Sequence, residues 1–130
     1  MQILRTLVAD DHPIFLEGLK LVLQRHPHFE IKIVGQARDG QELIELIRST
    51  PFDLLLMDLN MPGGMGGIET AQILLEKHET LQIIMLTMLD DITLIVEALE
   101  QGVKGWLLKD TGSEDIVEGI KTVNEGKRYL

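Results

Sequence analysis

Five polar residues of this chain stand directly after short apolar runs, in a combination suited to handling a phosphoryl group. Two adjacent carboxylates, Asp10 and Asp11, follow the first run, and a third carboxylate, Asp58, follows a later one. Thr87 and Lys109 follow two further runs. Carboxylate oxygens bind hard divalent cations such as Mg²⁺, and a carboxylate can attack phosphorus to form an aspartyl phosphate. A hydroxyl and an ammonium can then hold phosphoryl oxygens, provided that the fold gathers all five side chains.

The elements that must position these residues alternate between strands and helices. Strands are predicted at residues 3–9, 31–37, 54–57, 83–86 and 105–108, where aliphatic residues cluster over a strand's length. Helices are predicted at residues 13–25, 40–50, 68–77, 91–101 and 113–125, where apolar residues recur at helical spacing. Five strands that alternate with five helices favour right-handed βαβ crossovers and an α/β fold, with a parallel sheet covered on both faces.

The order of the strands decides which polar residues meet. In an open parallel sheet, ligands bind outside the carboxyl ends of the strands, at the point where the strand order reverses. The flavodoxin-like, doubly wound order 2-1-3-4-5 leaves the second strand, which no comparable polar residue follows, at the edge of the sheet. The same order brings together the ends of the first and third strands. We therefore expect Asp10, Asp11 and Asp58 to converge, with Thr87 and Lys109 beside them.

Three gathered carboxylates need a counter-charge. Two carboxylates ~4 Å apart repel each other by about 4 kcal/mol at an effective dielectric constant of about 20. Lys109 supplies one positive charge, and a divalent ion held by oxygen ligands, Mg²⁺ above all, supplies two. Asp58 stands alone at the end of the central strand and is the candidate nucleophile. The adjacent pair, Asp10 and Asp11, suits metal binding.

Length, composition and charge limit the classes of protein to which this chain can belong. The chain has 130 residues, which corresponds to one domain, and 0 cysteines, which excludes disulfides, thiolate zinc sites and cysteine nucleophiles. With 21 acidic and 12 basic residues the net charge is −9, which disfavours direct binding to nucleic acid or to an anionic membrane. No apolar run approaches the ~18 residues of a membrane helix, and the N-terminal apolar run is too short for a signal peptide. We expect a cytoplasmic protein with no membrane partner.

The ordered set of polar residues resembles the receiver domain of response regulators in two-component systems, over essentially the whole chain. The segments that carry the resemblance are Ala9-Asp10-Asp11-His12-Pro13, Met57-Asp58-Leu59-Asn60-Met61-Pro62, Ile84-Met85-Leu86-Thr87 and Gly105-Trp106-Leu107-Leu108-Lys109-Asp110. The first and last of these are similar to the NarL/FixJ (LuxR-type) subfamily. The resemblance implies the CheY-like form of the flavodoxin-like fold, with residues 1–130 as one receiver domain. The subfamily usually carries a C-terminal helix-turn-helix output domain. No such domain follows in this sequence, which fits an excised receiver or a stand-alone one, and we favour the excised receiver.

The resemblance also implies a role for each matching residue. Asp58 would accept a phosphoryl group from a phosphohistidine on a sensor histidine kinase, and Lys109 would pair with that group. Asp11, Asp58 and the backbone carbonyl of Asn60 would ligate Mg²⁺, with Asp10 acting mainly through a metal-bound water. Such a domain is a phosphoacceptor that assists its own phosphorylation and dephosphorylation, and is not an enzyme acting on a separate substrate.

Two further residues would form the switch. Thr87 would move toward the phosphoryl group and hydrogen-bond an oxygen, and Trp106, at the position of the family's switch aromatic, would turn inward as Thr87 moves. Tryptophan replaces the more usual Tyr or Phe here, and its bulk is expected to restrict burial. The resemblance implies that phosphorylation remodels one helical face and controls transcription through a DNA-binding domain outside this chain, with homodimerisation on phosphorylation as a further expectation.

Two other functions use the same fold and remain open at this point. A Mg²⁺-dependent phosphatase with Asp58 as nucleophile would need a second acid close by to protonate the leaving group, and Asn60 stands at the obvious position. A flavodoxin-like binding module would need Ser, Thr or Gly after the first strand, where this chain has two carboxylates. Of the residues near the acidic pair, His12 is interpreted as a helix cap or surface group, because Mg²⁺ prefers oxygen ligands.

Overall fold

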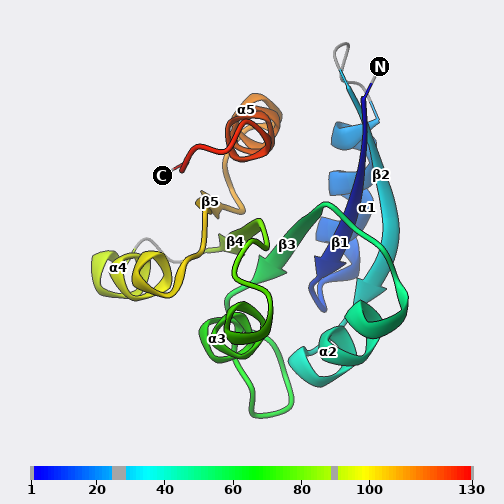
Figure 1. Cartoon of the computed structure of the whole chain (residues 1–130). Coiled ribbons are helices and arrows are strands. Elements are labelled where there is room, and N and C mark those ends of the chain that lie inside the picture. Colours follow the sequence, from blue (N-terminus) through cyan, green and yellow to red (C-terminus); the bar gives the residue numbers. More distant parts are fainter. Residues whose placement is uncertain (1, 25–28, 89–90, 130) are drawn as a thin grey trace.

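The computed structural model describes residues 2–24, 29–88 and 91–129. Its strands are β1 (Gln2–Ala9), β2 (Phe29–Ala37), β3 (Leu54–Asp58), β4 (Ile83–Thr87) and β5 (Gly105–Leu108). Its helices are α1 (Pro13–Leu23), α2 (Gly40–Ser49), α3 (Gly67–Lys77), α4 (Ile92–Gln101) and α5 (Ser113–Asn124). The strands form one parallel sheet in the order β2-β1-β3-β4-β5, which confirms the predicted topology (Figure 1).

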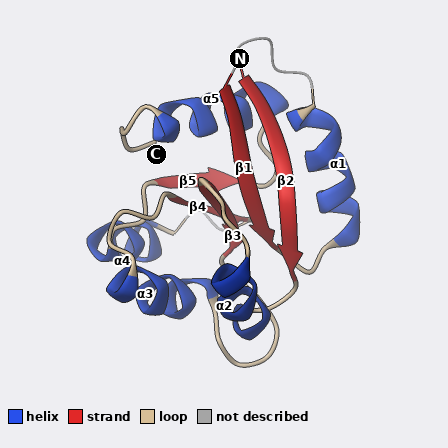
Figure 2. Ribbon diagram, turned by 45° about the vertical axis from the view of Figure 1, so that its right-hand side comes forward, coloured by secondary structure: helices blue, strands red, loops and turns tan. Residues whose placement is uncertain are grey.

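The helices cover the sheet on both faces, so the fold has three layers (Figure 2). One apolar cluster joins the sheet to α2, α3 and α4, through residues such as Leu43, Leu74 and Ala98. A second cluster joins the opposite face to α1 and α5, through residues such as Leu19 and Ile120. The central strands β3 and β4 are buried along their whole lengths, as expected for strands packed on both faces.

The predicted elements are all present, and their described boundaries differ from the predicted ones by at most two residues. The strand predicted at 31–37 begins two residues earlier, at Phe29. Helix α1 is described to Leu23, and its predicted end at Arg25 lies outside the described residues. Asp39 caps α2 by accepting a hydrogen bond from the Glu42 N–H at 2.8 Å. Gly102 ends α4 with a φ of 106°, a conformation that favours glycine.

Two backbone contacts place the residues after β3. The Leu59 N–H donates to Leu86 O at 3.0 Å and so continues the ladder between β3 and β4 beyond Asp58. The Gly67 N–H then donates to Leu59 O at 2.7 Å, which anchors the start of α3 beside the end of β3.

Among the described residues, no helix has the length and apolar character needed to cross a bilayer.

Candidate functional site

The carboxyl ends of β1, β3, β4 and β5 meet at one edge of the sheet and bring the predicted polar residues together. Asp10 follows β1, Asp58 is the last residue of β3, Thr87 is the last residue of β4, and Lys109 follows β5. Asp10, Asp58 and Thr87 are all buried, although each is polar. Buried polar groups persist only where they find partners or a function, and these three lie at the switch point of the sheet.

Lys109 links the two buried carboxylates. Its Nζ atom lies 2.7 Å from Asp10 Oδ2 and 3.1 Å from Asp58 Oδ2. The Lys109 side chain is only 6 % exposed, so these ion pairs form in a poorly solvated environment, where a charge without a partner would be costly. The contact with Asp10 is a close charge pair without the geometry of a hydrogen bond, whereas the contact with Asp58 is a hydrogen bond.

The environment of Asp58 changes its acidity. Burial raises the pKa of the Asp58 carboxyl above its ordinary value, and the nearby charge of Asp10 acts in the same direction. The hydrogen bond from Lys109 opposes this rise in pKa, as does the hydrogen bond from the Asn60 backbone N–H to Asp58 Oδ1 at 3.2 Å. Asp58 is thus a buried carboxyl with a raised pKa, oriented by donors on both of its oxygens.

The donor set around Asp58 fits a hard divalent cation. One ligand atom from each of Asp10, Asp11, His12 and Asp58 lies within 4.8 Å of the others. Asp11 Oδ1 is buried and has no hydrogen-bond partner among the described residues. The three carboxylates face one ammonium, that of Lys109, so two negative charges remain uncompensated when all are ionised. An oxygen-rich site with an orphaned carboxylate oxygen and excess negative charge suits Mg²⁺.

Thr87 and Trp106 flank this cluster on neighbouring strands. Thr87 is buried, and its carbonyl accepts a hydrogen bond from the Lys109 backbone N–H at 2.8 Å. Trp106 lies in register with Met85 of β4 and belongs to the apolar cluster under α4. The expectation that its bulk would restrict burial is wrong, because Trp106 is 5 % exposed. Its Nε1 atom has no hydrogen-bond partner within the described part of the chain.

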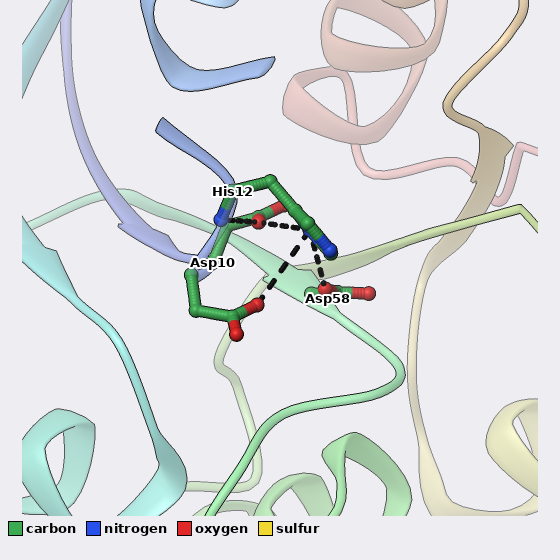
Figure 3. Close-up of side chains that lie close together, drawn as sticks. Asp10, His12 and Asp58 are labelled. Atoms are coloured by element: carbon green, nitrogen blue, oxygen red, sulfur yellow. Dashed lines mark hydrogen bonds and ion pairs between the residues drawn. The ribbon is translucent and has the colours of Figure 1, made fainter. Parts of the chain in front are cut away.

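His12 lies closer to Lys109 and the buried carboxylates than the sequence indicated. Its backbone is at the N-cap position of α1, but its side chain makes no capping hydrogen bond. Instead, Nδ1 lies 2.9 Å from Asp10 Oδ1 and 3.5 Å from Asp58 Oδ2 (Figure 3). The same Nδ1 atom lies 2.8 Å from Lys109 Nζ. Of the two interpretations of this side chain, the helix cap is wrong and the surface group is confirmed, since the side chain is 59 % exposed. A histidine at a cap position that favours Ser, Thr, Asp or Asn was the available signal, but its partner Lys109 is 97 residues away in the sequence.

The fold and the polar cluster define a flavodoxin-like domain with an acidic site at the switch point of its sheet. Residues 6–121 match the family described as the response regulator receiver domain, and the chain belongs to this family. Among curated relatives, it is 38% identical over 124 residues to the nitrate/nitrite response regulator protein NarL of Escherichia coli, covering 95% of this chain and 56% of NarL. It is also 40% identical over 126 residues to the transcriptional regulatory protein YdfI of Bacillus subtilis, covering 97% of this chain and 57% of YdfI. The chain spans about half the length of the curated relatives it matches.

Solved structures agree with this assignment. A two-component response regulator of the LuxR family from Aurantimonas superposes with a TM-score of 0.90 at 30% identity, covering 99% of this chain and 90% of that chain. The isolated receiver domain of RcsB from Salmonella enterica, solved with the phosphomimetic BeF₃⁻, superposes with a TM-score of 0.88 at 26% identity, covering 99% of this chain and 94% of that chain. The predicted family and its LuxR-type subfamily are thereby confirmed.

Proposed function

We propose that this chain is a phosphorylation-dependent signalling switch in which Asp58 is the phosphoacceptor. The single observation that carries the proposal is the pairing of one ammonium, that of Lys109, with both Asp10 and Asp58 inside a buried carboxylate cluster. The phosphodonor is the phosphohistidine of a sensor histidine kinase, as expected for a receiver domain. In the transfer, an Asp58 oxygen bonds to phosphorus, the P–N bond breaks, and the imidazole leaves.

The residues around Asp58 have separate tasks in this reaction. Asp10, Asp11, Asp58 and the backbone carbonyl of Asn60 would hold Mg²⁺, with Asp10 acting mainly through a water. When bound, the ion neutralises charge on the phosphoryl oxygens. The burial of Asp58 limits the access of water to the acyl phosphate. The Asn60 N–H keeps one Asp58 oxygen oriented through its 3.2 Å contact.

Lys109 and Thr87 would sense the phosphoryl group. Lys109 exchanges its contact with Asp58 for one with a phosphoryl oxygen, because its ammonium already lies 3.1 Å from the accepting carboxylate. The Thr87 hydroxyl turns toward a second oxygen, and Trp106 on the neighbouring strand responds because it packs under α4. The output is a change in the surface formed around α4, β5 and α5.

The output of the switch is transcription regulation. Several relatives are named as transcriptional regulatory proteins and are about twice as long as the match, and an RcsB structure similar to this chain was solved bound to a promoter. We propose that residues 1–130 act as the receiver of such a regulator. DNA is then contacted through a separate helix-turn-helix domain, and phosphorylation favours a homodimer.

The proposal is tested by incubating the chain with Mg²⁺ and acetyl phosphate and measuring the mass of the intact protein. We expect one phosphoryl adduct in the wild type and none in Asp58→Asn. Asp53→Asn is the matched control, because Asp53 precedes β3 at the opposite end from Asp58, and it should form the adduct normally. An adduct that persists in Asp58→Asn would exclude Asp58 as the phosphoacceptor. Catalytic turnover of a phosphate ester without any adduct would exclude the switch function and favour a phosphatase.

A further inference from the structure

The ammonium of Lys109 has three close polar neighbours. They are Asp10 Oδ2 at 2.7 Å, Asp58 Oδ2 at 3.1 Å and His12 Nδ1 at 2.8 Å. A lysine ammonium has three N–H donors and no acceptor, so it can only donate to His12 Nδ1 and to Asp58 Oδ2. Its contact with Asp10 Oδ2 is a charge pair. His12 is the only neutral partner of the three when its ring is uncharged, and it supplies the third contact without adding negative charge to the site.

The hydrogen bonds of His12 define which ring nitrogen accepts. Nδ1 also lies 2.9 Å from Asp10 Oδ1, an oxygen that accepts the His12 backbone N–H at 2.8 Å. Because the Lys109 ammonium can only donate, we assign Nδ1 as the acceptor and place the ring proton on Nε2. The side chain of His12 is 59 % exposed, so Nε2–H can be satisfied by water.

A second residue of α1 completes the surroundings of Lys109. The Lys109 Nζ atom lies 4.8 Å from the centroid of the Phe15 ring, within the range of a cation–π contact. Phe15 is three residues after His12, so both side chains lie on the same side of the first turn of α1. One turn of helix therefore contacts the ammonium with a nitrogen acceptor and with an aromatic face.

We infer that His12 and Phe15 are positioning residues that hold the Lys109 ammonium over Asp58, so that it meets the phosphoryl group at the moment of transfer. This inference rests on the proposed function, since it concerns the same transfer. The benefit is geometric: a long lysine side chain has several rotamers, and contacts to a fixed helix turn select the one that reaches Asp58. The N-cap residue of α1 thus orients the cation instead of capping the helix.

The test compares His12→Leu with His12→Asn. Leucine removes the acceptor and keeps similar bulk, whereas asparagine restores an oxygen acceptor at the position of Nδ1. Phosphorylation by acetyl phosphate in saturating Mg²⁺ should be roughly tenfold slower in His12→Leu, the size expected for losing one hydrogen bond to a charged group. His12→Asn should recover most of the wild-type rate, and Phe15→Leu should slow the reaction by a smaller factor than His12→Leu.

Two controls separate positioning from a general structural effect. His78→Leu changes another exposed histidine, at the C-cap of α3, and should react like the wild type. Affinity for Mg²⁺, measured by calorimetry, should stay within about twofold of the wild-type value in His12→Leu, since the three carboxylates are untouched. A loss of Mg²⁺ affinity that matches the loss of rate would assign His12 to metal binding and overturn the inference.

A double-mutant cycle with Lys109→Ala asks whether His12 acts through the lysine. In the Lys109→Ala background, His12→Leu should change the rate by less than about twofold, because the ammonium that it orients is gone. If the Lys109→Ala variants are phosphorylated too slowly to measure, the same cycle can be measured by the affinity for beryllium fluoride. If His12→Leu reacts like the wild type while Asp58 is phosphorylated normally, the inference fails and the proposed function stands. If the wild type forms no adduct at all, the proposed function itself fails.

Discussion

Gly67, the first residue of α3, lies directly against the backbone carbonyl of Asp58. A Cβ atom at position 67 would stand 2.6 Å from Asp58 O and 2.8 Å from Leu59 Cα, closer than non-bonded atoms approach in proteins. The contact involves backbone on both sides, so no side-chain rotation could relieve it. The helix that follows the candidate phosphoacceptor can therefore start at this place only because residue 67 has no side chain.

Gly67→Ala should accordingly destabilise the domain and disturb the site. We expect a loss of about 1–3 kcal/mol in the free energy of unfolding, the usual cost of overpacking, together with slower phosphorylation of Asp58. Gly18→Ala is the matched control, because Gly18 is exposed in α1 with nothing within 4 Å of its Cβ position. It should stabilise the domain by about 0.5–1 kcal/mol. Urea denaturation of both variants measures the difference, and equal effects would contradict the proposed clash.

Lys109→Ala should make the domain depend more strongly on Mg²⁺. Without the ammonium, the buried carboxylates of Asp10 and Asp58 lose their shared positive partner, and unpaired buried charges are destabilising. In EDTA we expect a lower melting temperature than that of the wild type, and saturating Mg²⁺ should raise it by more than it does in the wild type. Lys127→Ala removes an exposed lysine and should behave like the wild type in both buffers. An equal Mg²⁺ response in Lys109→Ala and wild type would contradict this charge balance.

The fluorescence of Trp106 should report the switch. Trp106 is the single tryptophan of the chain, it is buried, and it packs in the apolar cluster that includes Ala98 of α4. Adding Mg²⁺ with beryllium fluoride should change the Trp106 emission of the wild type. The same addition should leave the Trp106 emission of Asp58→Asn unchanged. An unchanged spectrum in the wild type at saturating analogue would remove Trp106 from the proposed switch.

The ion pair between Arg5 and Asp53 should give the domain a specific acid sensitivity. Hydrogen bonds from Arg5 Nε and the Arg5 backbone N–H both reach Asp53 Oδ2, at 3.1 and 2.9 Å, and lower the pKa of the Asp53 carboxyl below its ordinary value of 3.8. Because the folded-state pKa is lowered, the stabilisation is fully present above the unfolded pKa and is lost as pH falls through the folded one.

Comparison with Asp53→Asn isolates this contribution, since asparagine does not titrate. The wild type should be modestly more stable than the variant from pH 7 down to pH ~5, and the difference should shrink below pH ~4. The effect is small because both side chains are partly exposed, which weakens ion pairs. Urea denaturation across this pH range provides the measurement, and a difference that grows on acidification would contradict the assigned direction of the pKa shift.

Much of the fold could be predicted because its signals are local. The continuous apolar runs of β3 and β4 and the helical spacing in α5 depend only on neighbouring residues. The convergence of Asp10 with Asp58 followed from topology, since the carboxyl ends of adjacent parallel strands lie at the same edge. The proximity of these two residues could therefore be predicted without knowing where their side chains point, while their roles stay a proposal.

The sequence by itself determined the alternation of elements and the polar residues that end the strands, because both are short-range patterns. It favoured the order of the strands only through a general rule for open parallel sheets. Only the tertiary structure decided where individual side chains point. His12 turned away from capping α1 toward Lys109, and Trp106 fitted into the core despite its size. Such choices depend on contacts between residues far apart in the chain, whose energies no local pattern contains.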